Sequence, residues 1–193
     1  MSLSRQQITL MGIFALFLGP VILVMLMRSS WWQYQPDGLK NRGYLVQPPT
    51  QISLNAADQI ARRWAILYVL EPDCDQACSE QLKSLRQIHK AAGRNREHLS
   101  LVLLGKDEAE PSQQAIVDAI YPEFIWATDE ASVTLSTLDA INSKIMQNSA
   151  QADTLHTYIL DPMLNVILAY GADADPNDIH KDLKRLLKWS DQE

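Results

Sequence analysis

The segment Trp64–Ala91 reads "WAILYVLEPDCDQACSEQLKSLRQIHKA" and sets the first elements of the fold. Its opening, "WAILYVL", is a continuous apolar run, which predicts a strand buried on both faces. After "EPD" the spacing becomes helical over residues 75–92. Four residues share one side of this helix: Cys78, Leu82, Leu85 and Ile88. The segment therefore predicts a buried strand that leads into an amphipathic helix.

The chain beyond this segment continues the alternation. We expect strands at 99–104 and 123–128, helices at 111–120 and 130–145, a hairpin of strands 156–161 and 165–171, and a last helix that Asp175 caps and that runs to Trp189. The early strand–helix–strand units predict parallel strands, and the hairpin adds antiparallel ones. This order is that of a thioredoxin-like α/β domain, a central mixed sheet flanked by helices.

Cys74 and Cys78 are the two cysteines of the chain, and both lie at this strand-to-helix junction. Side chains four positions apart project on the same side of a helix, so the two sulfurs can converge. The positive helix N-terminus favours thiolates, whereas Glu71, Asp73 and Asp75 oppose them. A disulfide, a redox pair, a soft-metal site and two inert buried cysteines are the candidate interpretations.

His156 is the histidine that can serve as a third ligand. It opens the strand "LHTYILDP", and in a thioredoxin-like fold the start of this strand lies beside the cysteine loop. His89 lies 11 residues beyond Cys78, too far along the helix axis at roughly 16 Å. His98 and His180 lie in polar surroundings and are expected on the surface. The alternative for His156 is an ordinary histidine at a strand edge.

Residues 8–27 form a run of 20 residues without a charge, "ITLMGIFALFLGPVILVMLM". As a helix, this run covers a hydrocarbon core of roughly 30 Å. Trp31, Trp32 and Tyr34 follow and suit the headgroup zone. A cleaved signal peptide would have a shorter core that ends in small residues, so we expect a retained, single-pass membrane anchor. Arg5 favours a cytoplasmic N-terminus and Arg28 opposes it, and the short N-terminal tail with a single span favours the cytoplasmic side. This orientation puts the main domain in the periplasm or another extracytoplasmic space.

The 193 residues are expected to divide into an anchor at 1–28, a juxtamembrane linker and lead-in at 29–60, and a thioredoxin-like domain at 61–193. The dipeptide Pro48-Pro49 is expected to interrupt any regular element in the linker. After residue 28 the chain carries 15 basic and 23 acidic residues, a formal net charge of −8. This charge argues against nucleic acid as a partner.

With these features, the chain resembles the Sco/SenC family, the thioredoxin-fold copper-binding assembly factors of cytochrome c oxidase. The resemblance covers most of residues 60–190 and rests on the membrane anchor, "WAILYVLEPDCDQAC" at 64–78 and "LHTYILDPMLNVI" at 155–167. It implies that Cys74, Cys78 and His156 bind one copper ion, Cu(I) or Cu(II). It also implies a cytochrome c oxidase subunit, or another copper-handling assembly factor, as the partner.

The chain departs from this family at several positions. Family members usually carry proline after each cysteine, where this chain has Asp75 and Ser79, and "LLGKDEAEPS" replaces an Asp-Pro segment. The chain thus resembles a divergent member, a metallochaperone or assembly factor more than an enzyme. Two alternatives are a thiol-disulfide reductase for a partner's metal-binding cysteines and a non-catalytic assembly scaffold. Against the reductase, the proline that oxidoreductases place before the late strand is absent at Thr154-Leu155.

Overall fold

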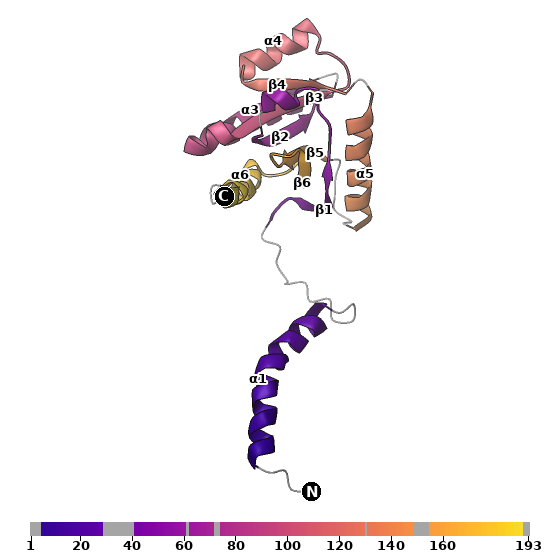
Figure 1. Ribbon diagram of the computed structural model, residues 1–193. Helices are drawn as coiled ribbons and strands as arrows, with labels where there is room; N and C mark the ends of the chain where they lie inside the picture. Colours follow the sequence, from indigo (N-terminus) through magenta and orange to yellow (C-terminus); the bar gives the residue numbers. More distant parts are fainter. Residues whose placement is uncertain are drawn as a thin grey trace. The chain divides into compact units, whose positions relative to one another are not determined.

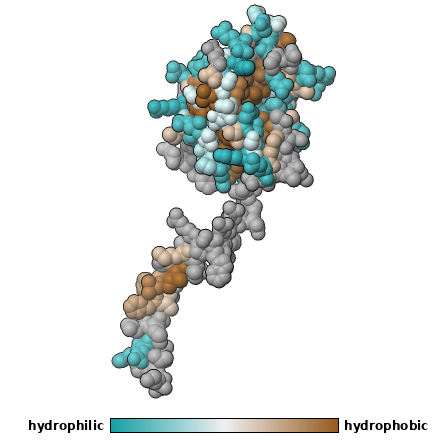
Figure 2. Space-filling model, turned by 90° about the vertical axis from the view of Figure 1, so that its right-hand side faces the viewer, coloured by the Kyte–Doolittle hydropathy of each residue, from teal (hydrophilic) through white to brown (hydrophobic). Residues whose placement is uncertain are grey.

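The structure is a computed structural model that describes residues 5–28, 41–60, 62–71, 74–129, 131–148 and 155–190. The chain divides into two units, residues 1–40 and residues 41–193. The described residues of the first unit form the helix α1 (Arg5–Arg28), with Pro20 inside it. Several apolar side chains of α1 are exposed, Leu16, Phe17 and Met25 among them, and they form the brown stretch of this helix in Figure 2.

The predicted membrane anchor coincides with α1, but the structure does not confirm it. Across the described part of the chain, no helix reaches the length and apolar character that crossing a membrane requires. The aromatic residues expected in the headgroup zone, Trp31, Trp32 and Tyr34, lie outside the described residues. The transmembrane assignment therefore stays a prediction.

The second unit is built on one six-stranded sheet with the strand order β1-β6-β5-β2-β3-β4 (Figure 1). Its strands are β1 (Tyr44–Gln51), β2 (Trp64–Val69), β3 (Leu99–Gly105), β4 (Phe124–Thr128), β5 (Leu155–Leu160) and β6 (Asn165–Gly171). Strands β2, β3 and β4 are parallel, whereas β5, β6 and β1 pair in antiparallel fashion. The predicted mixed sheet, with a parallel core and an antiparallel hairpin, is confirmed.

Helices cover both faces of this sheet. They are α2 (Ala57–Ile60), α3 (Gln76–Ala91), the 3-10 helix η1 (Gly93–His98), α4 (Pro111–Ile120), α5 (Val133–Asn148) and α6 (Pro176–Ser190). In Figure 1, α3 and α6 lie on one side of the sheet and α5 lies on the other. The longer helices and the strands predicted after residue 64 are all present, within a few residues of their expected bounds.

The central strands are buried on both faces, as the apolar runs predict. Along β3, Leu101 and Leu103 join the core under α3 and α6, while Val102 and Leu104 join the core on the side of α5. All four side chains are at most 1% exposed. This two-sided burial explains why the strand shows no polar alternation.

Strand β1 was not predicted, because it falls in the segment 29–60 that was expected to be a linker without regular elements. It pairs with β6 at the edge of the sheet, and its register shifts between Leu45 and Thr50, where Pro48 and Pro49 lie. Proline has no N–H to donate, so an edge strand with an irregular register accommodates it. The dipeptide therefore marks an edge strand and does not end the sheet.

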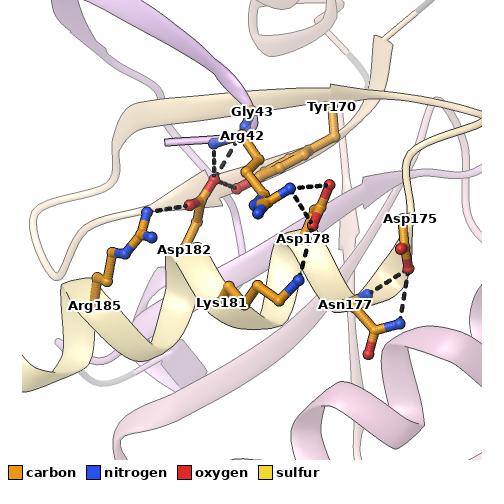
Figure 3. Close-up of polar contacts among 9 residues, drawn as sticks. All are labelled: Arg42, Gly43, Tyr170, Asp175, Asn177, Asp178, Lys181, Asp182 and Arg185. Carbon is orange, nitrogen blue, oxygen red and sulfur yellow. Dashed lines mark hydrogen bonds and ion pairs between the residues drawn. The ribbon is translucent and has the colours of Figure 1, made fainter. Parts of the chain in front are cut away.

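Asp182 of α6 fixes the point where the second unit begins. Its carboxylate is 1% exposed and accepts hydrogen bonds from the backbone N–H groups of Arg42 (2.6 Å) and Gly43 (3.0 Å). The Tyr170 hydroxyl donates to the same oxygen at 3.1 Å (Figure 3). Burial, followed by the charge of Asp182, raises the pKa of Tyr170, so this hydroxyl stays protonated as a donor.

Candidate functional site

Cys74 and Cys78 lie at the junction between the end of β2 and the start of α3, and a disulfide joins them. The S–S distance is 2.00 Å and the two Cα atoms are 5.2 Å apart. Cys78 occupies the first turn of α3, and Cys74 lies in the loop before it. The convergence expected from the four-residue spacing is therefore present, in the oxidised form.

Asp75, between the two cysteines, is the N-cap of α3. Its Oδ1 accepts a hydrogen bond from the backbone N–H of Cys78 at 2.9 Å, and its backbone is extended, as an N-cap requires. The Asp75 carbonyl accepts the N–H of Ser79 at 3.0 Å. The residue that departs from the family pattern thus starts the helix that carries the second cysteine.

Replacing Asp75 with alanine should lower the free energy of unfolding by about 1 kcal/mol, because the Cys78 N–H loses its acceptor. Asparagine also caps helices well, so Asp75→Asn should cost clearly less. Denaturant titration of the oxidised protein measures both values. Asp139→Ala on the exposed side of α5 is the control and should be near neutral. Equal losses for the alanine and asparagine variants would contradict the capping role.

His156 lies beside the disulfide because of the sheet topology. Strand β5 runs antiparallel to β2, with Thr157 opposite Tyr68, so the start of β5 lies at the end of β2 that leads to Cys74. His156 and Cys78 line the same cavity of about 240 Å³. The structure thus places His156 and Cys78 on the wall of one cavity, although His156 is 78 residues beyond Cys78, and Cys74 is bonded to Cys78. That the three residues act as ligands stays a prediction.

The surroundings of the disulfide are acidic. Glu71 and Asp75 line the cavity together with the ring of Tyr68. Burial raises the pKa of Tyr68, and the negative charges of Glu71 and Asp75 raise it further. Asp73, the third acid expected here, lies outside the described residues.

No metal centre is preformed in the described residues. Within these ranges, no three side chains of His, Cys, Asp or Glu are grouped so that they could hold a metal ion. The two sulfurs are bonded to each other, and metal binding requires them as separate thiolates. The oxidised protein can therefore exchange its disulfide but cannot offer two thiolates. Reduction is needed before Cys74 and Cys78 become soft metal ligands near the imidazole of His156.

Gln81 is a cavity residue that the sequence reasoning missed. It lies three positions after Cys78 on α3 and lines the cavity with His156. Its Nε2 is buried and has no hydrogen-bond partner in the described part of the chain. The i, i+3 relation to Cys78 is the signal that could have identified it.

The other histidines lie away from this cavity. His89 is buried, with Nδ1 3.0 Å from the Tyr121 hydroxyl and Nε2 3.0 Å from the Leu99 carbonyl. Burial lowers the pKa of His89, so the neutral ring both accepts and donates a hydrogen bond here. His98 is exposed and His180 is partly exposed. The ring of His89 therefore joins α3 to Tyr121 and to the start of β3, which is a structural role.

The mixed sheet, the flanking helices and the disulfide before α3 define a thioredoxin-like domain. Residues 64–190 match the family described as "transmembrane-like, thioredoxin-like, C-terminal domain", and the chain belongs to this family. A search of curated proteins found no match. The family assignment covers the chain from β2 to α6 and leaves out β1 and α2.

Solved Sco1 structures share the fold. Apo Sco1 from Thermus thermophilus is 14% identical, with a TM-score of 0.53, and the match covers 77% of this chain and 99% of that chain. Yeast Sco1 with copper bound is 12% identical, with a TM-score of 0.51 and coverage of 68% and 82%. The predicted likeness to Sco proteins is confirmed at the level of the fold.

Proposed function

We propose that this protein is a membrane-anchored, Sco-like copper-binding protein that assists the assembly of cytochrome c oxidase. The observation that carries the proposal is the cavity that Cys78 and His156 share, next to Cys74. Yeast Sco1, which has the same fold, has been solved with copper bound. Copper is the cargo of the proposed function, to be passed to a cytochrome c oxidase subunit or to another copper-handling assembly factor.

Copper binding begins from the reduced cysteine pair. A dithiol of a partner supplies two electrons and two protons, reduces the Cys74–Cys78 disulfide to two thiols and itself becomes a disulfide. Loss of the two thiol protons then gives two soft sulfur ligands for Cu(I) or Cu(II). His156 supplies a neutral imidazole nitrogen as the third ligand. Glu71 and Asp75 line the same cavity and attract a cation. Three ligands leave an open side, from which the ion can pass to a partner.

The anchor of the proposed protein is the uncharged stretch of residues 8–27 within α1. In the proposed arrangement the N-terminus lies in the cytoplasm, a single helix crosses the inner membrane, and residues 41–193 are extracytoplasmic. Protease added to intact spheroplasts should then digest the second unit. Complete protection of that unit would contradict this orientation.

The decisive experiment measures copper stoichiometry in the reduced, full-length protein in an uncharged detergent. We expect one copper ion per chain in the wild type and a large loss in Cys74→Ser, in Cys78→Ser and in His156→Ala, because each removes one of three ligands. His98→Ala is the matched control, since His98 is exposed and lies outside the cavity. Equal copper retention in all variants would refute the copper site.

Thiol-disulfide exchange is the second candidate function, and the observed disulfide favours it. Here the reduced pair would attack a partner's disulfide, release the partner as a dithiol and end as the Cys74–Cys78 disulfide. This reaction needs both cysteines but not His156. An exchange assay in which His156→Ala keeps full activity, together with absent copper binding, would favour the reductase.

Rescue of oxidase assembly by a Cys74→Ser, Cys78→Ser double variant would instead identify a scaffold.

A further inference from the structure

A second cavity lies at the opposite end of the parallel strands from the disulfide. It measures about 710 Å³, within the usual range of small-molecule sites of roughly 300–1,000 Å³. Its walls come from three segments: residues 59 and 63 before β2, residues 89–101 from the end of α3 through η1 into β3, and residues 123–125 at the start of β4. The charged and hydroxyl side chains that line it include Arg63, Arg94, Arg96, Glu97, Glu123 and Ser100.

Positive charge is concentrated at this cavity. After residue 28 the chain has a net charge of −8 and seven arginines, and three of the seven line this one cavity. Arg96 is paired with Glu123. Arg63 is held in place because its Nε and Nη2 donate to the carbonyls of Ile60 and Gln59 at 2.9 and 2.7 Å.

Arg94 has no partner in the described part of the chain and is exposed at the cavity wall. Its five N–H donors are therefore available to a ligand. The cavity is lined by three guanidinium groups: that of Arg94 is free, that of Arg63 is held by two backbone carbonyls, and that of Arg96 is paired with Glu123. With the carboxylates of Glu97 and Glu123, the lining has a net charge of +1, although the chain after residue 28 is acidic.

Ser100 supplies an independent observation. The residue is 3% exposed and lines the cavity, and its hydroxyl has no hydrogen-bond partner among the described residues. Buried hydroxyls are rarely left without a partner, because losing water without gaining a hydrogen bond is unfavourable. An oxygen of a bound ligand would accept the hydrogen bond that this hydroxyl can donate.

We propose that this cavity binds a phosphate ester, with Arg94 and Arg63 contacting the phosphate oxygens and the Ser100 hydroxyl donating to the ligand. The planar guanidinium fork matches the geometry of phosphate oxygens. The ester can come from a soluble metabolite or from the headgroup of an anionic phospholipid. This site is separate from the disulfide, so the proposal does not depend on the copper function.

The test uses the full-length protein in an uncharged detergent and titrates it with glycerol 3-phosphate in a calorimeter. Vesicles of phosphatidylglycerol, measured by flotation, provide the lipid arm. Arg94→Gln should weaken binding about tenfold, as expected for the loss of a charge-assisted hydrogen bond. Lys83→Gln removes an equal charge from the exposed side of α3 and should leave binding unchanged.

The two arms identify the source of the phosphate. Arg94-dependent binding of glycerol 3-phosphate indicates a soluble ester, and Arg94-dependent binding of vesicles alone indicates a lipid headgroup. No saturable binding in either arm, or binding that Arg94→Gln and Lys83→Gln leave equally strong, would overturn the proposal.

The variant Ser100→Ala tests whether the unpartnered hydroxyl of Ser100 contacts a ligand or is only an unfavourable buried group. The substitution removes a group without a partner, so it should leave the free energy of unfolding unchanged or raise it. We expect the same variant to weaken binding several-fold, because the ligand loses a hydrogen bond. Unchanged affinity in Ser100→Ala would exclude this hydroxyl from the site and overturn the proposed role of Ser100.

Discussion

Replacing Asp182 with alanine should lower the free energy of unfolding by about 3 kcal/mol or more. One carboxylate oxygen accepts the backbone N–H groups of Arg42 and Gly43 and the hydroxyl of Tyr170. Alanine leaves these donors without that acceptor. The Gly43 N–H and the Tyr170 hydroxyl are buried, and each buried donor without an acceptor costs about 1–3 kcal/mol. Gly43 is tightly placed, since a Cβ there would lie 2.5 Å from the ring of Tyr170.

Denaturant titration measures this loss, and amide hydrogen exchange at Gly43 reports it locally. The matched control is Asp178→Ala, one turn earlier on α6. Asp178 forms surface ion pairs with Arg42 (3.2 Å) and Lys181 (3.4 Å), and such exposed pairs are worth about 0–1 kcal/mol (Figure 3). If Asp182→Ala costs no more than Asp178→Ala, Asp182 does not anchor the start of this unit.

The substitution Leu82→Ala should cost about 3 kcal/mol, within the range of about 2–5 for buried leucines. Leu82 is 0% exposed and lies one turn after Cys78 on α3, in the core that α3 shares with β3 and α6. Alanine removes apolar contacts and leaves a cavity that the strands beneath cannot fill without moving. Because α3 carries Asp75 as its cap and Cys78 in its first turn, looser docking of this helix should also loosen the cysteine site.

Thermal or chemical unfolding of the oxidised protein measures this loss. Lys83→Ala, at the next position on the exposed side of α3, should change stability by no more than about 0.5 kcal/mol. A similar small change in both variants would mean that α3 does not depend on this contact. Copper retention in Leu82→Ala should fall together with stability if α3 positions Cys78 against His156.

Most of the core elements could be predicted from local pattern. The run "WAILYVL" and the spacing of Cys78, Leu82, Leu85 and Ile88 both reflect burial, and burial imposes a period on neighbouring residues. Strand β1 escaped prediction because its prolines resemble a break in the chain, and they are tolerated at a sheet edge with an irregular register. Helix α2 is only four residues long, too short to show a period.

The candidate site could be predicted in part. The spacing of Cys74 and Cys78 indicated convergence, and the order of the strands placed His156 nearby. Gln81 was missed because an uncharged polar residue near a helix start carries no distinctive pattern. The cavity around Arg94 was also missed, because its residues come from three segments that only the folded sheet brings together.

By itself the sequence determined the alternation of strands and helices, the cap at Asp175 and the convergence of Cys74 and Cys78. These features depend on residues a few positions apart, where backbone geometry dictates which side chains meet. Tertiary structure alone decided that Asp182 accepts the N–H of Gly43, 139 residues away, and that His156 and Cys78 line one cavity. These contacts join residues far apart in the sequence, so they form only when strand pairing has brought the segments together. A buried polar group such as Asp182 must then find its partners among the segments that the fold places around it.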